Sequence, residues 1–465
     1  MGLRIFDTLT GKEKTLDQTG TIRIYVCGVT VYDESHIGHA RTIIVFDTLR
    51  RFLESQGSKV VFIQNFTDVD DKIINRAKEE NVSASLISSK YTEQYFMDFD
   101  RLNIKRATNH PKATEHIQDM IELIKSLISK NCAYVSKNGV YFVVSKFKEY
   151  GKLSKKKTDE LIAGARIEVD ETKNDPLDFA LWKFADDEPK WPSPWGDGRP
   201  GWHIECSAMS LKYLGENFEI HGGGRDLIFP HHENEIAQSE SYTGKPFAKI
   251  WMHVGMMTIN GEKMSKSVGN IKSVDHVLKN WGPTVIRLFC LSGHYSKPID
   301  YSEELLKENI AKWRQVENCY FETALAEGQG PTDEVQNLLG MVKNEFDEAL
   351  ESDFNTPLAI TAFFKLVREL NRLAASESLT KSISKLVLPE LERMLEVLGL
   401  KIPELAENEK NVVSELIKKR NMFREQKKYQ EADEVRKQLL SNGIILIDHK
   451  NRTLWLKQEK IAAEK

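Results

Sequence analysis

The chain has 465 residues, with 65 Lys and Arg against 69 Asp and Glu and a formal net charge of −4. This length exceeds that of one ordinary domain and is sufficient for several hydrophobic cores. The near-balanced charge excludes a chain that is basic throughout, as many nucleic-acid-binding proteins are, although a local basic face stays compatible with it. No apolar run approaches the ~20 residues of a membrane-spanning helix, which excludes an integral membrane protein.

Five cysteines are scattered widely, at positions 27, 132, 206, 290 and 319. Their odd number and wide spacing do not predict a disulfide framework and favour a reducing compartment. The first residues lack the apolar core of a signal peptide. We therefore expect a cytoplasmic protein, and we further expect a monomer that does not bind membranes.

The first hundred residues alternate between strand-like and helix-like segments. Strands are predicted at residues 21–26 and 59–64, each followed by a helix, from about 39 to 55 and from about 70 to 80. This βαβα alternation predicts an α/β fold with a Rossmann-like, doubly wound parallel sheet. Ligands of such sheets bind at the carboxyl ends of the strands, which is where Cys27 and Thr67 fall.

A His-Ile-Gly-His motif at residues 36–39 opens the first of these helices. Free backbone N–H groups and the helix dipole favour a phosphate at a helix N-terminus, and neutral histidines can donate hydrogen bonds there without adding a fixed charge. Taken alone, a His-x-x-His pair is more often structural or part of a metal site. The motif therefore needs a second feature before it indicates a nucleotide site.

Residues 104–200 do not continue the strand–helix alternation of the first hundred residues. They are predicted to be an insertion that splits the nucleotide-binding fold. They include a predicted helix at 115–130, a hairpin around Asn138-Gly139 and a basic run at 155–157. The nucleotide-binding fold is expected to resume near Gly201 and to end by about Lys249.

Cysteine, histidine and glutamate recur where the fold resumes. His231 and Glu235 are spaced i and i+4 on a predicted helical stretch and so share a face, with His232 and Glu235 as a rival pair. Cys27 and Cys206 lie far away in the sequence, so the spacing gives no zinc-finger signal. On spacing alone these residues are better explained by burial, helix packing and capping than by a metal site.

A second motif, Lys-Met-Ser-Lys-Ser at residues 263–267, lies in a polar stretch flanked by Gly and Asn and is predicted to be a loop. Its lysines, Lys263 and Lys266, can follow the charge that develops on a departing pyrophosphate. A solvated surface loop is the alternative.

After residue 301 apolar residues recur near every 3.6 positions, which predicts a helical bundle. The last sixty residues begin with a Lys- and Arg-rich helix at about 412–424 and end in strand-like pieces at 443–447 and 452–456. A charged helix is often only a solvated face.

The two motifs at 36–39 and 263–267, in this order and with a strand before the first, resemble the signature pair of class I aminoacyl-tRNA synthetases. The segments between and around them resemble the cysteinyl-tRNA synthetase family almost end to end. The C-terminal region departs from the family, because Asn451–Trp455 replace its usual Gly-Thr-Thr-Trp turn. The matching segments are residues 25–30, 65–72, 178–183, 201–209, 221–227 and 229–235.

This resemblance implies a ligase that activates cysteine with ATP and Mg²⁺ to cysteinyl-adenylate and transfers cysteine to the 3′ end of tRNA(Cys). It also implies a role for individual residues. The implied sets are His36, His39, Lys263 and Lys266 for catalysis; Gly38, Gly222, Gly223, Asp226 and Lys266 for ATP; Gly28, Thr67, Trp202 and His221 for cysteine; Cys27, Cys206, His231 and Glu235 for one Zn²⁺; and Trp455 for tRNA.

A zinc ion of this kind has a chemical reason. Serine differs from cysteine by one atom, and an apolar pocket cannot reject it by the factor of about 10⁴–10⁵ that translation needs. That factor corresponds to roughly 5–7 kcal/mol of differential binding. Because zinc binds a thiolate far better than an alcohol, the implied metal could supply this selectivity without an editing domain.

The resemblance further implies an order of domains. The expected order is a catalytic domain at 1–103 and 201–249, a connective insertion at 104–200, a signature-loop and tRNA stem-contact subdomain at 250–300, a helical bundle at 301–405 and an anticodon-binding domain at 406–465.

Two other functions remain open from the sequence. A cysteine:amino-sugar ligase built on the same catalytic domain would not need the region after 301. A non-catalytic RNA-binding paralogue should have lost signature residues, and His36, His39, Lys263 and Lys266 are all present.

Overall fold

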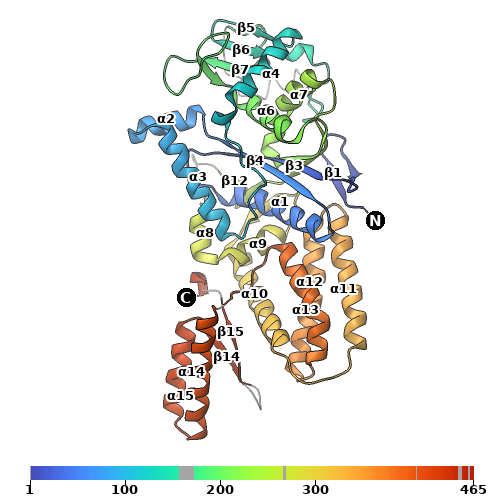
Figure 1. The fold of residues 1–465 in the computed structure, drawn as a ribbon, viewed down its shortest axis with the longest axis vertical. Helices are drawn as coiled ribbons and strands as arrows, with labels where there is room; N and C mark the ends of the chain where they lie inside the picture. Colours follow the sequence, from blue (N-terminus) through green and yellow to red (C-terminus); the bar gives the residue numbers. More distant parts are fainter. Residues whose placement is uncertain are drawn as a thin grey trace. The chain divides into compact units, whose positions relative to one another are not determined.

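The computed structural model describes residues 2–156, 172–264, 269–404, 406–448, 453–458 and 461–464. Its chain forms two compact units (Figure 1). The first contains Met1–Val274, His294–Asp300 and Glu351–Phe354, and the second contains Asp275–Gly293, Tyr301–Leu350 and Asn355–Lys465.

The first unit is built on a four-stranded sheet in the order β10-β9-β3-β4, in which all neighbours are parallel. Its strands are β3 (Ile22–Thr30), β4 (Val60–Thr67), β9 (Phe218–Gly224) and β10 (Ala248–Val254). They are rich in apolar and β-branched residues and largely buried, as expected for strands of a parallel sheet covered on both faces. The predicted parallel α/β fold is therefore confirmed.

Helices α1 (Ile37–Ser55), α2 (Asp71–Glu80) and α3 (Ala84–Arg101) follow the first two strands of this sheet. Helix α1 begins two residues before the predicted start, because His36 caps it. Two later helices of the same unit are α6 (Trp202–Leu214) and α7 (Glu233–Thr243).

A bulge interrupts β3 at its carboxyl end. Val26 pairs with Gln64 and Val29 with Phe66, so Cys27 and Gly28 together face the single residue Asn65. The Gly28 N–H donates to the Asn65 side-chain oxygen at 2.9 Å. Bulges of this kind change the direction of a side chain, and here the residue concerned is Cys27.

The predicted insertion contains a second sheet, antiparallel and in the order β5-β6-β7-β8. The predicted hairpin is confirmed, because β5 and β6 pair antiparallel around 138–139, and the predicted helix appears as α4. Lys157 of the basic run lies outside the described residues. The elements are α4 (Ile117–Ser129), β5 (Ala133–Val135), β6 (Gly139–Phe142), β7 (Phe179–Phe184) and β8 (Gly198–Pro200).

Smaller elements complete the first unit. Strands β1 and β2 form a hairpin, and β11, β12 and β13 form a three-stranded sheet. Short helical turns precede α4 and α7 and follow β6. The bounds are β1 (Arg4–Asp7), β2 (Lys12–Thr15), β11 (Met257–Ile259), β12 (Glu262–Lys263), β13 (Ile299–Tyr301), η1 (Ala113–His116), η2 (Val144–Lys146), η3 (Arg225–Leu227) and η4 (Ile228–His232).

The second unit is mainly helical, as the apolar periodicity predicts. Long helices pack through fully buried side chains such as Trp313, Phe363 and Leu366. The helices are α8 (Val274–Trp281), α9 (Pro283–Leu291), α10 (Glu303–Ala324), α11 (Asp333–Glu351), α12 (Thr356–Ala375) and α13 (Lys381–Leu398).

A small module ends this unit, with helices α14 (Glu407–Glu425) and α15 (Tyr429–Ser441) beside the antiparallel pair β14 (Ile444–Asp448) and β15 (Thr453–Lys457). The charged helix and the two strands are as predicted, whereas α15 was not predicted. Its buried positions are only Ala432, Val435 and Leu439, so it carries little apolar signal.

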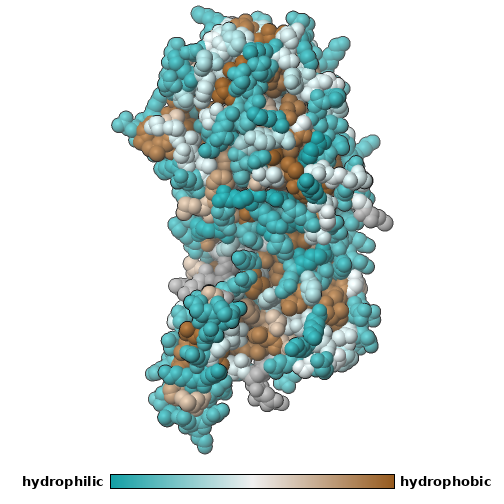
Figure 2. All heavy atoms as spheres, viewed as in Figure 1, coloured by the Kyte–Doolittle hydropathy of each residue, from teal (hydrophilic) through white to brown (hydrophobic). Residues whose placement is uncertain are grey.

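Within the described ranges, none of the helices has both the length and the apolar character needed to cross a membrane. Figure 2 shows a face on which hydrophilic side chains surround scattered apolar ones.

Candidate active site

Two histidines cap the N-terminus of α1 and each other. The His36 Nδ1 accepts hydrogen bonds from the N–H groups of Gly38 and His39, at 3.1 and 3.3 Å. In return the His36 N–H donates to the His39 Nδ1 at 3.3 Å, and the two rings stack with centroids 3.6 Å apart. Since both Nδ1 atoms accept, each neutral ring carries its proton on Nε2 and donates from that nitrogen.

This geometry corrects one expectation about the first motif. The N–H groups of Gly38 and His39, expected to be free for a phosphate, are occupied by the His36 ring. A phosphate at this helix end would therefore be met by imidazole N–H groups, which extend further from the helix than the backbone does.

The second motif reaches the first one. A Cβ placed on Gly38 would lie 3.2 Å from the Met264 side chain, so the Met264 methyl group packs over that glycine. The chain after the motif is bound to the start of α1 as well, because Ile37 donates to Lys272 and Val274 donates to Ser35, at 3.0 and 2.8 Å. Met264 of the second motif and the chain from Lys272 to Val274 are thus held near the start of α1.

The structure describes only one of the two lysines of this motif. Lys263 ends the two-residue strand β12, whereas a loop was predicted, and β12 pairs with β11. Lys266 lies outside the described residues. The proximity of the two motifs therefore rests on Met264 and on the chain that follows.

Buried Cys, His and Glu side chains gather beside the bulge in β3. Cys27, Cys206, His231 and Glu235 form a group whose ligand atoms all lie within 4.8 Å of one another. The Cys27 Sγ lies 3.7 Å from the Cys206 Sγ and 3.4 Å from a Glu235 oxygen, and the His231 Nε2 lies 3.1 Å from that oxygen. The four predicted zinc ligands, from β3, α6, η4 and α7, are therefore together.

A second group of four shares two of these members. Cys27, His221, His232 and Glu235 also lie within 4.8 Å of one another. The His232 Nε2 is 3.3 Å from the Cys27 Sγ, and the His221 Nε2 is 3.4 Å from the second Glu235 oxygen. His221, predicted to contact cysteine, thus lies fully buried against the cluster, and the rival His232 is equally close.

The chemistry of the first group fits a metal. Two thiols, one imidazole and one carboxylate are the donors that Zn²⁺ takes in proteins. The second Glu235 oxygen is buried without a hydrogen-bond partner among the described residues, as is the His221 Nδ1. A buried carboxylate beside two thiols is costly unless a cation compensates it, so the residues present suit a divalent soft cation.

The protonation of the cluster follows from burial and from its own charges. Burial, together with Cys206 and Glu235, raises the pKa of the Cys27 thiol well above its ordinary value. Burial also opposes ionisation of Cys206, but the Cys27 thiol and His231 lower its pKa to about 6. Burial likewise opposes ionisation of Glu235, yet His221 and His231 hold its pKa well below its ordinary value. Against the effect of burial, Glu235 and Cys206 raise the pKa of His231 to about 10, so one thiolate and one carboxylate are favoured beside a protonated His231 before a metal binds.

Neighbouring rings fix the orientation of His231. The His203 Nδ1 lies 3.0 Å from the His231 Nδ1, which leaves the Nε2 of His231 to face Glu235. The Trp202 ring packs on His231 with centroids 4.2 Å apart and is 38% exposed, so it forms a solvent-facing wall beside the cluster.

Two further residues of the site, Glu205 and His253, were missed by sequence reasoning. Glu205 is buried and accepts a hydrogen bond from the Thr67 hydroxyl at 2.7 Å. The His232 Nδ1 lies 2.8 Å from the His253 Nε2, whose other nitrogen is 2.8 Å from the Thr8 hydroxyl. Glu205 lies beside Cys206 in the matching segment 201–209, but His253 carries no local signal, because only the pairing of β9 with β10 brings it here.

The glycines at the end of β9 are explained first by packing. A Cβ on Gly222 would lie 2.1 Å from the Phe46 ring of α1, and one on Gly223 would lie 2.9 Å from Leu227. Asp226 lies exposed in η3 just after them. Their predicted contacts with ATP stay predictions.

In the second unit, Trp455 lies half-buried in β15, with its ring centroid 6.4 Å from that of Phe321. Its predicted contact with tRNA stays a prediction.

Comparison with known proteins identifies relatives along the whole chain. Residues 13–311 match the family described as tRNA synthetases class I (C) catalytic domain, and residues 345–402 match the DALR domain. A cysteine–tRNA ligase of Thermodesulfovibrio yellowstonii is 49% identical over 97% of this chain and 99% of its own length. One of Carboxydothermus hydrogenoformans is 50% identical, with the same two coverages.

Among solved structures, a Mycobacterium tuberculosis methionyl-tRNA synthetase in complex with methionyl-adenylate has a TM-score of 0.63 at 15% identity. The match covers 82% of this chain and 92% of that one. At that identity it shows a common fold.

Proposed function

The chain belongs to the class I tRNA synthetases of the cysteine type, and we propose that it activates cysteine with ATP and joins it to tRNA(Cys). In the first step the cysteine carboxylate attacks the α-phosphorus of ATP, which gives cysteinyl-adenylate and pyrophosphate. In the second step a hydroxyl of the terminal tRNA ribose takes the acyl group and AMP leaves. No protein nucleophile is needed, so catalysis consists of positioning and charge stabilisation.

The observation that carries this proposal is the meeting of two features at the carboxyl edge of one parallel sheet. The capped histidine pair opens α1 directly after β3, and the group of Cys27, Cys206, His231 and Glu235 lies at the end of β3. A nucleotide phosphate and a soft side chain can therefore be bound within one site, at the edge where such sheets bind ligands.

His36 and His39 donate to the phosphates of ATP from their Nε2–H groups. Lys263 and Lys266 neutralise the charge that develops on the departing pyrophosphate. A Cβ on Gly38 would lie 3.0 Å from the His36 ring and 3.2 Å from the Met264 methyl group, so the glycine leaves room for the two motifs to approach each other. Gly222, Gly223 and Asp226 bind the nucleoside, and Mg²⁺ accompanies the triphosphate rather than occupying a protein cage.

The cysteine pocket is formed by Gly28, Thr67, Trp202 and His221 beside the metal ligands. A Zn²⁺ held by Cys27, Cys206, His231 and Glu235 supplies the preference for a thiol over an alcohol. His203 keeps the His231 ring in place, and Glu205 takes the only proton of the Thr67 hydroxyl. Thr67 can then act only as an acceptor in the pocket, which suits the α-ammonium group of an amino acid.

The proposed domain roles are those that the proposed synthetase function implies. Residues 1–103 and 201–249 form the catalytic domain, 104–200 the connective insertion, 250–300 the subdomain that carries the second motif, and 301–405 the bundle. Residues 406–465, with Trp455, bind the anticodon.

Cysteine-dependent ATP–pyrophosphate exchange, followed by charging of tRNA(Cys), tests this function. We expect both activities, and we expect serine to support neither. Exchange with cysteine but charging of an amino sugar instead of tRNA would replace the proposal by the sugar ligase, and absence of exchange would leave a non-catalytic paralogue.

A further inference from the structure

Arg41 is a fully buried arginine in the second turn of α1, the helix that begins with the first motif. Burying a guanidinium group is costly unless its N–H groups are hydrogen-bonded. The two terminal nitrogens of Arg41 donate hydrogen bonds of 2.7–3.2 Å to four backbone carbonyls, those of Gly255, Met256, His294 and Lys297. One side chain therefore joins α1 to two other segments of the first unit.

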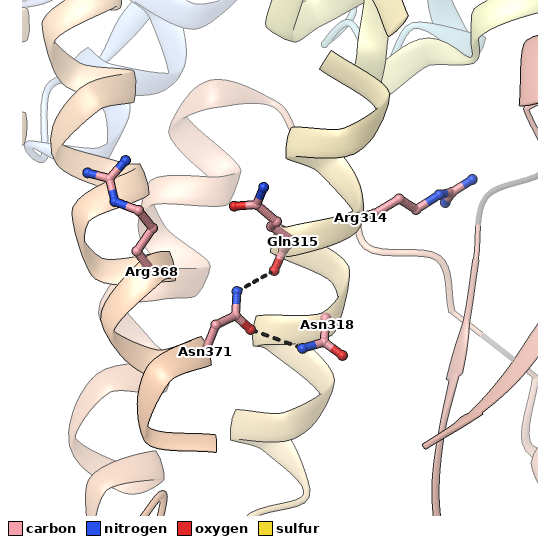
Figure 3. Close-up of a pocket in the computed structure, with 5 residues that line it drawn as sticks. All are labelled: Arg314, Gln315, Asn318, Arg368 and Asn371. Atoms are coloured by element: carbon pink, nitrogen blue, oxygen red, sulfur yellow. Dashed lines mark hydrogen bonds between the residues drawn. The ribbon is translucent and has the colours of Figure 1, made fainter. Parts of the chain in front are cut away.

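Other arginines of the chain have different surroundings. Arg51, ten residues further along α1 and also buried, is held by the Asp47 carboxylate at 2.8 Å. In a pocket between helices α10 and α12, Figure 3 shows the guanidinium groups of Arg314 and Arg368 pointing away from the amide side chains between them. Arg41 instead points into the protein and spreads a planar fork of donors over backbone carbonyls, which a lysine could not do.

The two segments that this guanidinium binds, residues 255–256 and 294–297, form the base of the three-stranded sheet β12-β11-β13. The first directly precedes β11 and the second shortly precedes β13. Backbone hydrogen bonds of 2.7 and 3.1 Å join them, from Gly255 to Tyr295 and from Ile299 to Met256. Lys263 of the second motif ends β12, so the place of its backbone depends on where this sheet base lies.

The chain that carries the second motif is thus attached to the start of α1 both before and after the motif. After it, the attachment is made by backbone hydrogen bonds between residues 35–37 and 272–274. Before it, the attachment to the sheet base is made by the side chain of Arg41. Backbone pairing does not need a particular side chain, whereas the second attachment depends on one guanidinium group.

We propose that Arg41 is a positioning residue for cysteine activation. By fixing the sheet base against α1, it sets the separation between the histidines at the start of α1 and the backbone of Lys263. The inference rests on the proposed function, because it takes the roles given there to the two motifs. Arg41 is fully buried and acts through these residues. A displacement of about 1 Å in such an arrangement can lower a rate about 100-fold.

The test compares Arg41→Lys with Arg51→Lys, the same change at the other buried arginine of α1. Lysine keeps the charge but loses the planar fork. Kinetics of cysteine-dependent ATP–pyrophosphate exchange, metal content and thermal midpoints are measured for both. We expect Arg41→Lys to lower kcat by about 10–100-fold, with the KM for cysteine and the metal content unchanged. We expect Arg51→Lys to keep the wild-type kcat even where its thermal midpoint falls as far.

A double-mutant cycle with Lys263→Ala separates positioning from general destabilisation. If Arg41 acts through Lys263, Arg41→Lys should lower kcat by a smaller factor when that lysine is already absent. A residue with a purely structural role would cause the same fold-loss in both backgrounds.

Gly255→Ala tests the same contact if Arg41→Lys does not fold. A Cβ on Gly255 would lie 2.2 Å from the Lys297 carbonyl oxygen, so this change forces apart the two segments that Arg41 joins. We expect the same selective loss of kcat.

A wild-type kcat in Arg41→Lys or in Gly255→Ala would overturn the inference. An equal loss of kcat in Arg51→Lys would also overturn it, and so would equal losses in the two backgrounds of the cycle. Absence of exchange in the wild type would instead overturn the proposed function, so the two failures are distinguishable.

Discussion

At the scale of single residues, His36 and His39 bind each other before they bind any ligand. Their reciprocal hydrogen bonds use both Nδ1 atoms, so the tautomer of each ring is fixed in advance. Fixed donors need no reorganisation when charge develops on a phosphate, which is the condition for electrostatic catalysis.

Changing Lys266 to Ala should lower the rate of cysteine activation by about 10²–10³, because one donor to the transition state is lost. Metal content and the thermal midpoint should stay at wild-type values, since the residue belongs to a polar sequence segment and is not one of the predicted metal ligands. ATP–pyrophosphate exchange measures the effect. Near wild-type exchange in this variant would contradict the role given to the second motif.

His110 gives a prediction for stability. Its Nδ1 lies 3.1 Å from the Gln64 carbonyl, and its Nε2 accepts from the Ala107 N–H at 3.1 Å. Burial lowers the pKa of His110 to about 4. The unfolded chain binds a proton below about pH 6.5 and the folded chain does not, so stability present above pH 6.5 is lost as the pH falls toward 4.

Between pH 7.5 and 5 this difference amounts to about 2 kcal/mol. We therefore expect the thermal midpoint of the wild type to fall more steeply over that range than the midpoint of His110→Gln, while the exposed control His276→Gln follows the wild type. Parallel pH profiles for wild type and His110→Gln would contradict the assignment.

At the scale of elements, the bulge in β3 determines where Cys27 points. A Cβ on Gly28 would lie 1.6 Å from the Asn65 carbonyl oxygen, so no side chain fits without separating β3 from β4. Gly28→Ala should cost about 1–3 kcal/mol or more through overpacking, and it should also reduce metal binding because Cys27 moves.

Gly20→Ala is the matched control, since nothing lies within 4 Å of a Cβ there. The thermal midpoint and the bound metal per chain measure both effects. A Gly28→Ala variant with the stability and metal content of the control would show that the bulge has no such role.

Elements with a local signal could be predicted from the sequence. The βαβα segment, the hairpin around Asn138-Gly139 and the bundle all follow from apolar periodicity or turn residues. Helix α15 could not, because three buried positions give a weak period, and neither could the bulge, because it depends on the pairing of β3 with β4.

The features of the candidate site also separate into those that are local in the sequence and those that depend on tertiary packing. The capped motif at 36–39 is local in sequence, and the structure adds its hydrogen-bond pattern. Glu205 and His253 are tertiary features, so only the packed sheet brings them to Thr67 and His232. The choice between His231 and His232 could not be made from i, i+3 and i, i+4 spacing, and the structure places both against Glu235.

At the scale of the whole molecule, the first unit has its own large apolar core, which includes Tyr25, Trp182 and Trp251 beside the two cluster cysteines. The ligand residues come from four separate elements that this core already holds. Metal binding therefore need not supply the folding free energy, in contrast to a zinc finger.

The central claim, that this cluster selects cysteine, is tested most directly by Cys206→Ser against wild type in ATP–pyrophosphate exchange with cysteine and with serine. We expect the wild type to prefer cysteine by about 10⁴–10⁵. We expect the variant to lose zinc and this preference, with a thermal midpoint within a few degrees of wild type. A variant that has lost zinc yet still activates cysteine and rejects serine as the wild type does would contradict the claim.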